Sequence, residues 1–433
     1  MLQVESPRSA LRYHSERRLS PQVFSAATRA AVLVVGLVAF GSARAADPAG
    51  APVPGTPDLS PARLQPTIDL PEWLAQATGL DNGRSEPQDS ARLRWDVLPF
   101  VISNPLEGVG LGVATIGTFR IGSDPSTGYS TVAASGVTTT HAQRTLDIRS
   151  ELRLPADRWI LVGDYAANRL PSPAWGVGDH QPDSEETLVD ERGLVLHETA
   201  YRRLLGPAYV GLGYFFDEDY DIVDIRAKAG EATAFNAYPL GTHGRSRSSG
   251  FTASFLLDGR DNPVDPWRGL YCLARFRLNP RWAGSDQAWQ SLWVETRAYQ
   301  PVVPRASLAL WTYGWFTFGP TPYFMLPSNG GDPEMRSARG WIQGRHVGRA
   351  LVGAEAELRV AIWQFVAGAL GTSVHAVSAE DGGGHAPDFR RAWPAASAGV
   401  RLTLDRRSLS SLALDVGWRP GGHGEYIAFN QAF

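Results

Sequence analysis

The stretch "LVGAEAELRV", residues 351–360, alternates between two kinds of side chain. Every second residue is apolar, namely Val352, Ala354, Ala356, Leu358 and Val360. The positions between them include three charges, Glu355, Glu357 and Arg359. Because side chains of a strand point alternately to opposite faces, the stretch predicts a strand with one apolar and one charged face. A soluble sheet and a membrane-spanning barrel both contain such strands, so the rest of the chain must discriminate between them.

The same alternation recurs along the chain from about residue 92. It is clear in "TLDIRSELRL" (145–154), "GVRLTLD" (399–405) and "LALDVGWRP" (412–420), each with charges on one face only. At roughly 20 residues per strand with its connection, residues 92–433 hold about 16 strands, with 12–14 as the alternative if loops are long. The fold class we predict is all-β: a closed, transmembrane, antiparallel β-barrel with an inward-folding extracellular loop.

Composition agrees with a membrane barrel. Mean hydropathy is -0.19, and no apolar run of the length needed for a spanning helix follows Leu93. The chain has 14 Trp and 13 Tyr, and aromatic residues gather where barrel strands leave the membrane. Six Trp near predicted strand ends are expected in such girdles: Trp95, Trp159, Trp267, Trp311, Trp341 and Trp418.

The two ends of the chain indicate export to the outer membrane. Residues 1–45 combine a basic start, the apolar run "AAVLVVGLVAF" (30–40) and "ARA" (43–45), which predicts a signal peptide cut after Ala45. Residues 46–91 are rich in proline and are expected to form a mostly disordered periplasmic linker, with residues 92–433 forming the barrel. The ending "EYIAFNQAF" is similar to the terminal aromatic strand of bacterial outer-membrane barrels, in which the last residue, here Phe433, serves as an assembly signal.

Three stretches resemble the bacterial surface antigen superfamily, the barrel of BamA- and TamA-like assembly factors. The first, "DGRDNPVDPWRG" (258–269), resembles its hairpin motif through Asp258, Arg260, Asp261, Pro266 and Gly269. The second, residues 169–204, contains "WGVGD" and resembles short members that lack the periplasmic repeat domains. The proline and asparagine residues of the first stretch predict a tight turn independently of the resemblance.

The third stretch, residues 329–360, resembles the long loop that folds into the lumen of these barrels. Its motif is Arg339–Gly340–Trp341, with Arg345 downstream. The resemblance implies that the loop arginine pairs with an acid on the barrel wall, and Glu355 and Glu357 are the nearest candidates. An Asp that relatives carry on the following strand is missing here, since "FVAGALGTS" (365–373) has Ala367 and Ala369 instead. Asp258 and Asp261 are the other candidate partners for Arg339.

Two functions are open at this point. The resemblance implies an outer-membrane barrel that assists insertion or translocation of protein or lipid, while a charged lumen equally suits a passive pore for small solutes. An enzyme is not expected, because the sequence has no GxSxG or HExxH motif, and no catalytic residue, cofactor or metal site is predicted. The expected partners are outer-membrane lipid and lipopolysaccharide, the outer-membrane assembly machinery during biogenesis, and a client protein or lipid. The net charge of -3 argues against nucleic acid.

Overall fold

The computed structural model describes residues 68–70, 73, 94–104, 108–124, 126–332, 336–379, 387–405 and 409–429. The predicted signal peptide and Phe433 lie outside the described residues, as does nearly all of the predicted linker. No helix in the described part of the chain combines the length and apolarity needed to cross a membrane.

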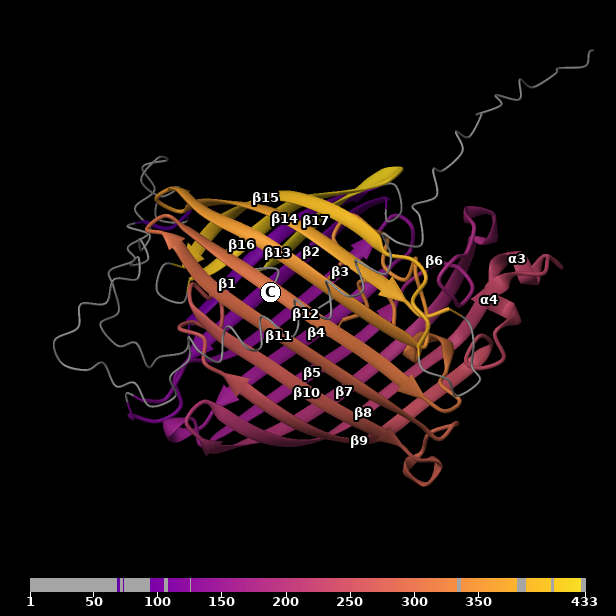
Figure 1. The fold of residues 1–433 in the computed structure, drawn as a ribbon, viewed down its shortest axis with the longest axis horizontal. Helices are drawn as coiled ribbons and strands as arrows, with labels where there is room; N and C mark the ends of the chain where they lie inside the picture. Colours follow the sequence, from indigo (N-terminus) through magenta and orange to yellow (C-terminus); the bar gives the residue numbers. More distant parts are fainter. Residues whose placement is uncertain are drawn as a thin grey trace, which may run out of the picture.

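Seventeen strands are described, and they curve around a common interior (Figure 1). The first nine are β1 (Arg94–Asn104), β2 (Gly108–Phe119), β3 (Ser130–Thr139), β4 (Arg144–Arg153), β5 (Trp159–Arg169), β6 (Ser172–Ala174), β7 (Thr187–Leu205), β8 (Ala208–Asp224) and β9 (Gly244–Asp258). The remaining eight are β10 (Gly269–Asn279), β11 (Trp289–Val303), β12 (Ala306–Phe318), β13 (Ala350–Trp363), β14 (Val366–Val377), β15 (Trp393–Asp405), β16 (Ser410–Arg419) and β17 (Gly422–Phe429).

Each strand pairs antiparallel with the strand that follows it in the sequence, except that β5 and β6 do not pair with each other. Instead, β6 continues the line of β5 along the edge of β7. Both pair with β7: Ser172–Ala174 with its first residues and Trp159–Arg169 with the rest. The wall therefore has 16 positions among the described residues, which confirms the predicted strand number over the alternative of 12–14. Pairing between β17 and β1, which would close the ring, is absent from the registers of the described residues, so closure of the cylinder stays a prediction.

Antiparallel alternation gives the barrel two distinct ends. At one, the turn end, β1 begins, β17 ends, and two-residue turns such as 206–207, 304–305 and 364–365 connect strands. At the other, the loop end, lie the long connections 170–186, 225–243 and 319–349. The short helices α3 (Ile225–Lys228) and α4 (Ala234–Ala237) belong to the second of these and stand at the right of the view beside β6 (Figure 1).

The two faces of the wall follow the alternation that the sequence predicts. On β13, Glu355, Glu357 and Arg359 are buried in the interior. On β4, Leu146 and Ile148 are exposed on the outer surface. The interior is not simply polar, however, because a continuous cluster of aromatic and aliphatic side chains also fills it, with Trp293, Trp311 and Tyr313 among its members.

The predicted aromatic girdle is therefore correct only in part. Trp95, Trp159 and Trp418 are exposed, as expected of girdle residues. The prediction is wrong for the other three, Trp267, Trp311 and Trp341, which are buried. Trp311 shows one reason for an inward position: its indole N–H donates to the buried carboxylate of Glu295 at 2.9 Å.

Candidate functional site

The connection 319–349 carries the Arg-Gly-Trp motif into the barrel, and its own side chains fix its shape. The amide oxygen of Asn329 accepts from the His346 N–H at 2.8 Å, while its NH₂ group donates to the Ile342 carbonyl at 2.8 Å. The Asp332 carboxylate accepts from the N–H groups of Arg336 and Ser337. These bonds satisfy backbone groups that would otherwise be buried without partners, so the tip enters the barrel as a defined turn.

At the tip, Arg339 bridges two carboxylates from different strands. Its Nη2 donates to Glu357 Oε2 on β13 at 2.6 Å, and its Nη1 donates to Asp415 Oδ2 on β16 at 3.0 Å. All three side chains are buried, with Glu357 only 1% exposed. A guanidinium can serve two separate acceptors in fixed directions, which an ammonium cannot do, so arginine specifies the position of the tip.

Two wall arginines complete the charge network. Arg401 on β15 contacts the same two acids, at 2.6 Å to Asp415 and 3.2 Å to Glu357. Arg359 donates to the other oxygen of Glu357 at 2.8 Å. Three guanidinium groups thus contact two carboxylates, and each of the three contacts Glu357.

Gly340 is required because the loop backbone lies directly on the wall. Its φ is +112°, which disfavours other residues, and a Cβ would lie 3.0 Å from the backbone of Trp418. The Gly340 N–H donates to the Tyr426 hydroxyl at 2.7 Å, and that hydroxyl donates to the Trp341 carbonyl at 3.2 Å. Arg419 donates to the Gly340 carbonyl at 2.7 Å. The tip is therefore bonded to β17, the last strand of the wall.

Trp341 anchors the tip against the strands before β17. Its indole N–H donates to the Pro394 carbonyl at 3.1 Å, and its ring packs edge-on against His346 and Trp393. His346 in turn lies 2.9 Å from His375 on β14, between ring nitrogens. Together with Arg339 and Gly340, these contacts join the loop to every strand from β13 to β17.

A second attachment holds the loop at the mouth of the loop end. Arg345 lies over the Trp175 ring at 4.8 Å and pairs with Asp183 at 2.8 Å. The Gly178 N–H donates to the Val347 carbonyl at 2.8 Å. The "WGVGD" segment and the long loop, which the sequence places more than 150 residues apart, therefore pack on each other, and an apolar cluster that includes Phe235 of α4 lies beneath them.

The hairpin motif lies at the turn end. Asp258 accepts two bonds from Arg260, at 2.8 and 2.9 Å, and Asp261 accepts from the N–H groups of Trp267 and Arg268. Gly269 has φ +116°, and a Cβ there would collide with the Gly259 carbonyl. These are the bonds of a rigid turn, and Asp258 also lies 3.7 Å from Arg153 of β4. The suggestion that Asp258 or Asp261 pairs with Arg339 is therefore wrong, since Arg339 pairs with Glu357 and Asp415.

One contact links the hairpin to the charge network. The Pro266 carbonyl accepts from Arg359 Nη1 at 3.4 Å, while Arg359 Nε holds Glu357. A continuous chain of contacts therefore runs from the turn end to the loop tip.

Of the two predicted wall acids, the structure assigns a direct role to one. Glu357 pairs with Arg339, whereas Glu355 accepts from the Ala338 N–H at 2.7 Å and so holds the backbone beside it. The partner that sequence reasoning missed is Asp415. It contacts Arg339 from β16, and its signal was present in the inward face of "LALDVGWRP", which carries Asp415 and Arg419.

No protein-family model and no curated protein matches the sequence. Among solved structures, CdiB from Escherichia coli matches with TM-score 0.50 and 11% identity, over 79% of this chain and 61% of that one. BamA from Haemophilus ducreyi lacking POTRA domains 1-3 matches with TM-score 0.47 and 14% identity, over 79% and 69%. CdiB from Acinetobacter baumannii matches with TM-score 0.44 and 12% identity, over 78% and 65%. The chain is thus shorter than each of these three proteins, and it shares the barrel fold of CdiB from Escherichia coli.

Proposed function

We propose that this chain is an outer-membrane β-barrel of the bacterial surface antigen superfamily that assists insertion or translocation of protein or lipid. Its outer surface supports a membrane location. Exposed apolar side chains cover successive strands, and Trp159 at the turn end of β5 lies beneath the Arg202 guanidinium, as expected where a strand leaves the hydrocarbon.

The observation that carries the proposal is the contact of the loop tip with the last strand. Gly340 donates to Tyr426 of β17, while Arg339 holds Asp415 of the neighbouring β16. A strand at the end of a sheet has unpaired backbone groups that can accept a further strand from a client. If β17 pairs with β1 in the closed cylinder that we predict, a loop bonded to β17 is in a position to control how readily the two strands separate.

Assisting insertion or translocation does not require a catalytic group. The alternative function, a passive pore for small solutes, is less well supported by the structure. The lumen contains the buried charge network and the aromatic cluster, and the loop end is covered by residues 170–186 and 319–349. A steadily open pore would need these elements to move aside.

Depletion in the native cell tests the proposed function. We expect loss of the protein to change the outer-membrane proteome or the lipid asymmetry of that membrane, and the wild-type gene to restore both. Arg339→Ala should restore them incompletely, whereas Arg345→Ala, on the same loop but paired with an exposed acid, serves as the matched control. An unchanged proteome and unchanged asymmetry after depletion would exclude the role. Heat-modifiable gel mobility of the membrane fraction, measured in parallel, tests the barrel itself.

A further inference from the structure

Five neighbouring strands place basic and phenolic side chains at one register level near the loop end. Arg144 of β4 is paired with Arg169 of β5, and Arg169 with Arg192 of β7. The series continues through Tyr220 of β8 to Arg245 of β9. We call these five residues the arginine row.

The arginine row lies on the outer surface. Arg144 shares its face of β4 with the exposed Leu146, and Arg169 shares its face of β5 with the exposed Trp159. The side chains of Arg192 and Arg245 are 48% and 57% exposed. These arginines therefore point away from the interior.

The height of the row corresponds to the edge of a membrane. Trp159 and Arg169 are the first and last residues of β5. Ten steps of about 3.3 Å, on a strand tilted by about 40°, give a height of about 25 Å, which is the height of the apolar band of such barrels. If Trp159 marks one membrane surface, the arginine row marks the other, on the side of the long loops.

The charge of this surface is not balanced by the protein. Arginines directly opposite each other on paired strands repel, which destabilises a sheet. Asp190 pairs with Arg169 at 2.7 Å and Asp221 with Arg192 at 2.8 Å. Arg144 has no hydrogen bond or ion pair within the described residues. At the other end of the row, Arg245 and the neighbouring Arg247 share a single acid, Glu218. Both ends of the row therefore have spare positive charge.

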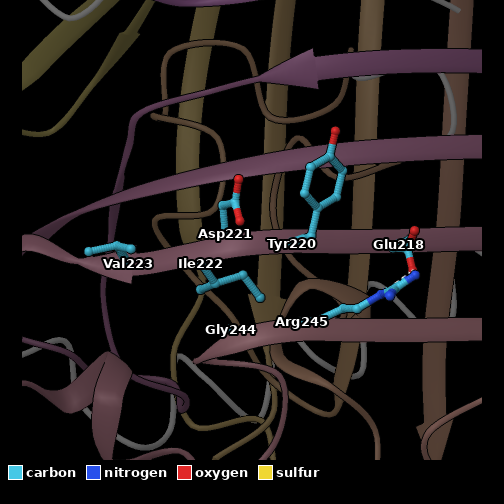
Figure 2. Close-up of a pocket in the computed structure, with 7 residues that line it drawn as sticks. All are labelled: Glu218, Tyr220, Asp221, Ile222, Val223, Gly244 and Arg245. Carbon is cyan, nitrogen blue, oxygen red and sulfur yellow. Dashed lines mark hydrogen bonds and ion pairs between the residues drawn. The ribbon is translucent and has the colours of Figure 1, made fainter.

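A hollow adjoins the row where it ends on β8 and β9 (Figure 2). It has a volume of about 610 Å³ and is lined by Glu218, Tyr220, Asp221, Ile222, Val223, Gly244 and Arg245. A guanidinium and a phenol thus lie beside the half-buried Val223, whereas Ile222 is only 4% exposed and belongs to the buried apolar cluster. That combination suits the junction between a polar head group and an acyl chain.

We infer that the arginine row binds the phosphate groups of a phosphorylated lipid in the outer leaflet. Guanidinium groups bind phosphate through paired, charge-assisted hydrogen bonds, and the spacing along the row offers several such contacts to one head group. The inference rests on the proposed outer-membrane location and adds a ligand to it.

Titration of lipid A into the detergent-solubilised full chain tests the inference, with binding followed by native mass spectrometry. The decisive variant is Arg144→Gln with Arg245→Gln, because Arg144 loses no hydrogen bond or ion pair to any of the residues that the structure describes, and Glu218 keeps Arg247. We expect affinity for diphosphorylated lipid A to fall at least about tenfold, since each lost contact is a charge-assisted hydrogen bond. Arg202→Gln is the matched control, an outward arginine at the turn end, and should bind as wild type.

Three results would overturn the inference: wild-type affinity in the double variant, an equal loss in Arg202→Gln, or equal binding of dephosphorylated lipid A. Complete displacement of the lipid by millimolar inorganic phosphate would also overturn it, because the surface would then recognise any anion. The single variant Arg144→Gln decides the matter if the double variant does not fold. Failure of the proposed function is distinguishable, since an unaltered outer membrane after depletion leaves the measured lipid affinity intact.

Discussion

Replacement of Arg339 by alanine should release the loop tip, and the structure sets the size of the effect. Arg339 makes two charge-assisted hydrogen bonds to buried carboxylates, each worth about 1.5–3 kcal/mol. Removing one partner of a buried ion pair usually costs about 3–5 kcal/mol, because a charge is left unpaired. Here Arg359 and Arg401 still contact the carboxylates. We therefore expect docking of the tip to weaken by about 2–4 kcal/mol.

Such a loss raises the undocked fraction by about 30- to 700-fold. Single-channel recording in planar bilayers measures it as the frequency of openings, which should be rare for wild type and far more frequent for Arg339→Ala. Arg345→Ala removes a bond to Asp183, whose side chain is 72% exposed, together with a bond to the Gln181 carbonyl and the contact with the Trp175 ring. Because none of these contacts leaves a buried carboxylate without a partner, this control should raise the frequency less than Arg339→Ala does.

The ordering of variants gives a stricter test than one variant alone. Glu357→Gln should open the lumen more than Arg339→Ala, because Arg339, Arg359 and Arg401 each lose a charged partner. Equal opening frequencies in Arg339→Ala and wild type would refute the locked tip. Equal effects of Arg339→Ala and Arg345→Ala would show that the buried network contributes no more than the rim contact.

Three further outcomes are expected. Gly340→Ala places a Cβ 3.0 Å from the Trp418 backbone at φ +112° and should make the loop sensitive to limited proteolysis, at a cost of about 1–3 kcal/mol. Gly344→Ala also meets a positive φ, +71°, but has open space around it, so it controls for backbone strain alone and should be affected less. Glu198 projects from the outer face of β7, so Glu198→Leu should raise the free energy of unfolding in lipid vesicles by about 1–2 kcal/mol, and no gain would argue against lipid at that position. Burial, reinforced by neighbouring basic groups, lowers the pKa of His346 in the docked loop. In a released loop the imidazole would titrate near pH 6.5, so docking should be strongest above about pH 6.5 and weaken progressively below it. Hydrogen exchange of the loop would measure this dependence, and His346→Gln should remove it.

The faces of the strands could be predicted from the sequence because the two-residue period is a local property. Glu357 and Arg359 are buried as the alternation of "LVGAEAELRV" requires. The pairing between them and the loop is not local. Asp415 lies 76 residues after Arg339, and only the register of three intervening pairs of strands brings the two together. A pattern within one strand contains no information on that distance.

Aromatic residues expose the limit of the same reasoning. Trp311 follows an apolar run, and a girdle position was the natural prediction, yet its ring is buried beside Tyr313 at 4.6 Å between centroids. Its inward direction follows from the register, which pairs Trp311 with the buried Glu355. Alternation within β12 alone does not say whether Trp311 points inward or outward. The register with β13 does, because it places Trp311 opposite a buried charged residue.

The loop is held by two attachments of different physical character, and this difference bears on how it could move. At the tip, charged groups hold it in a confined interior, where a guanidinium retains its charge and needs carboxylates or water. At the mouth, an apolar cluster around Val347 and Phe235 holds it, and such contacts are less sensitive to charge. The chain of contacts from Pro266 through Arg359 to Glu357 reaches only the tip. A disturbance of the hairpin at the turn end can therefore weaken the grip on Arg339 while the contacts at the mouth, between Gly178 and Val347 and within the apolar cluster, stay in place.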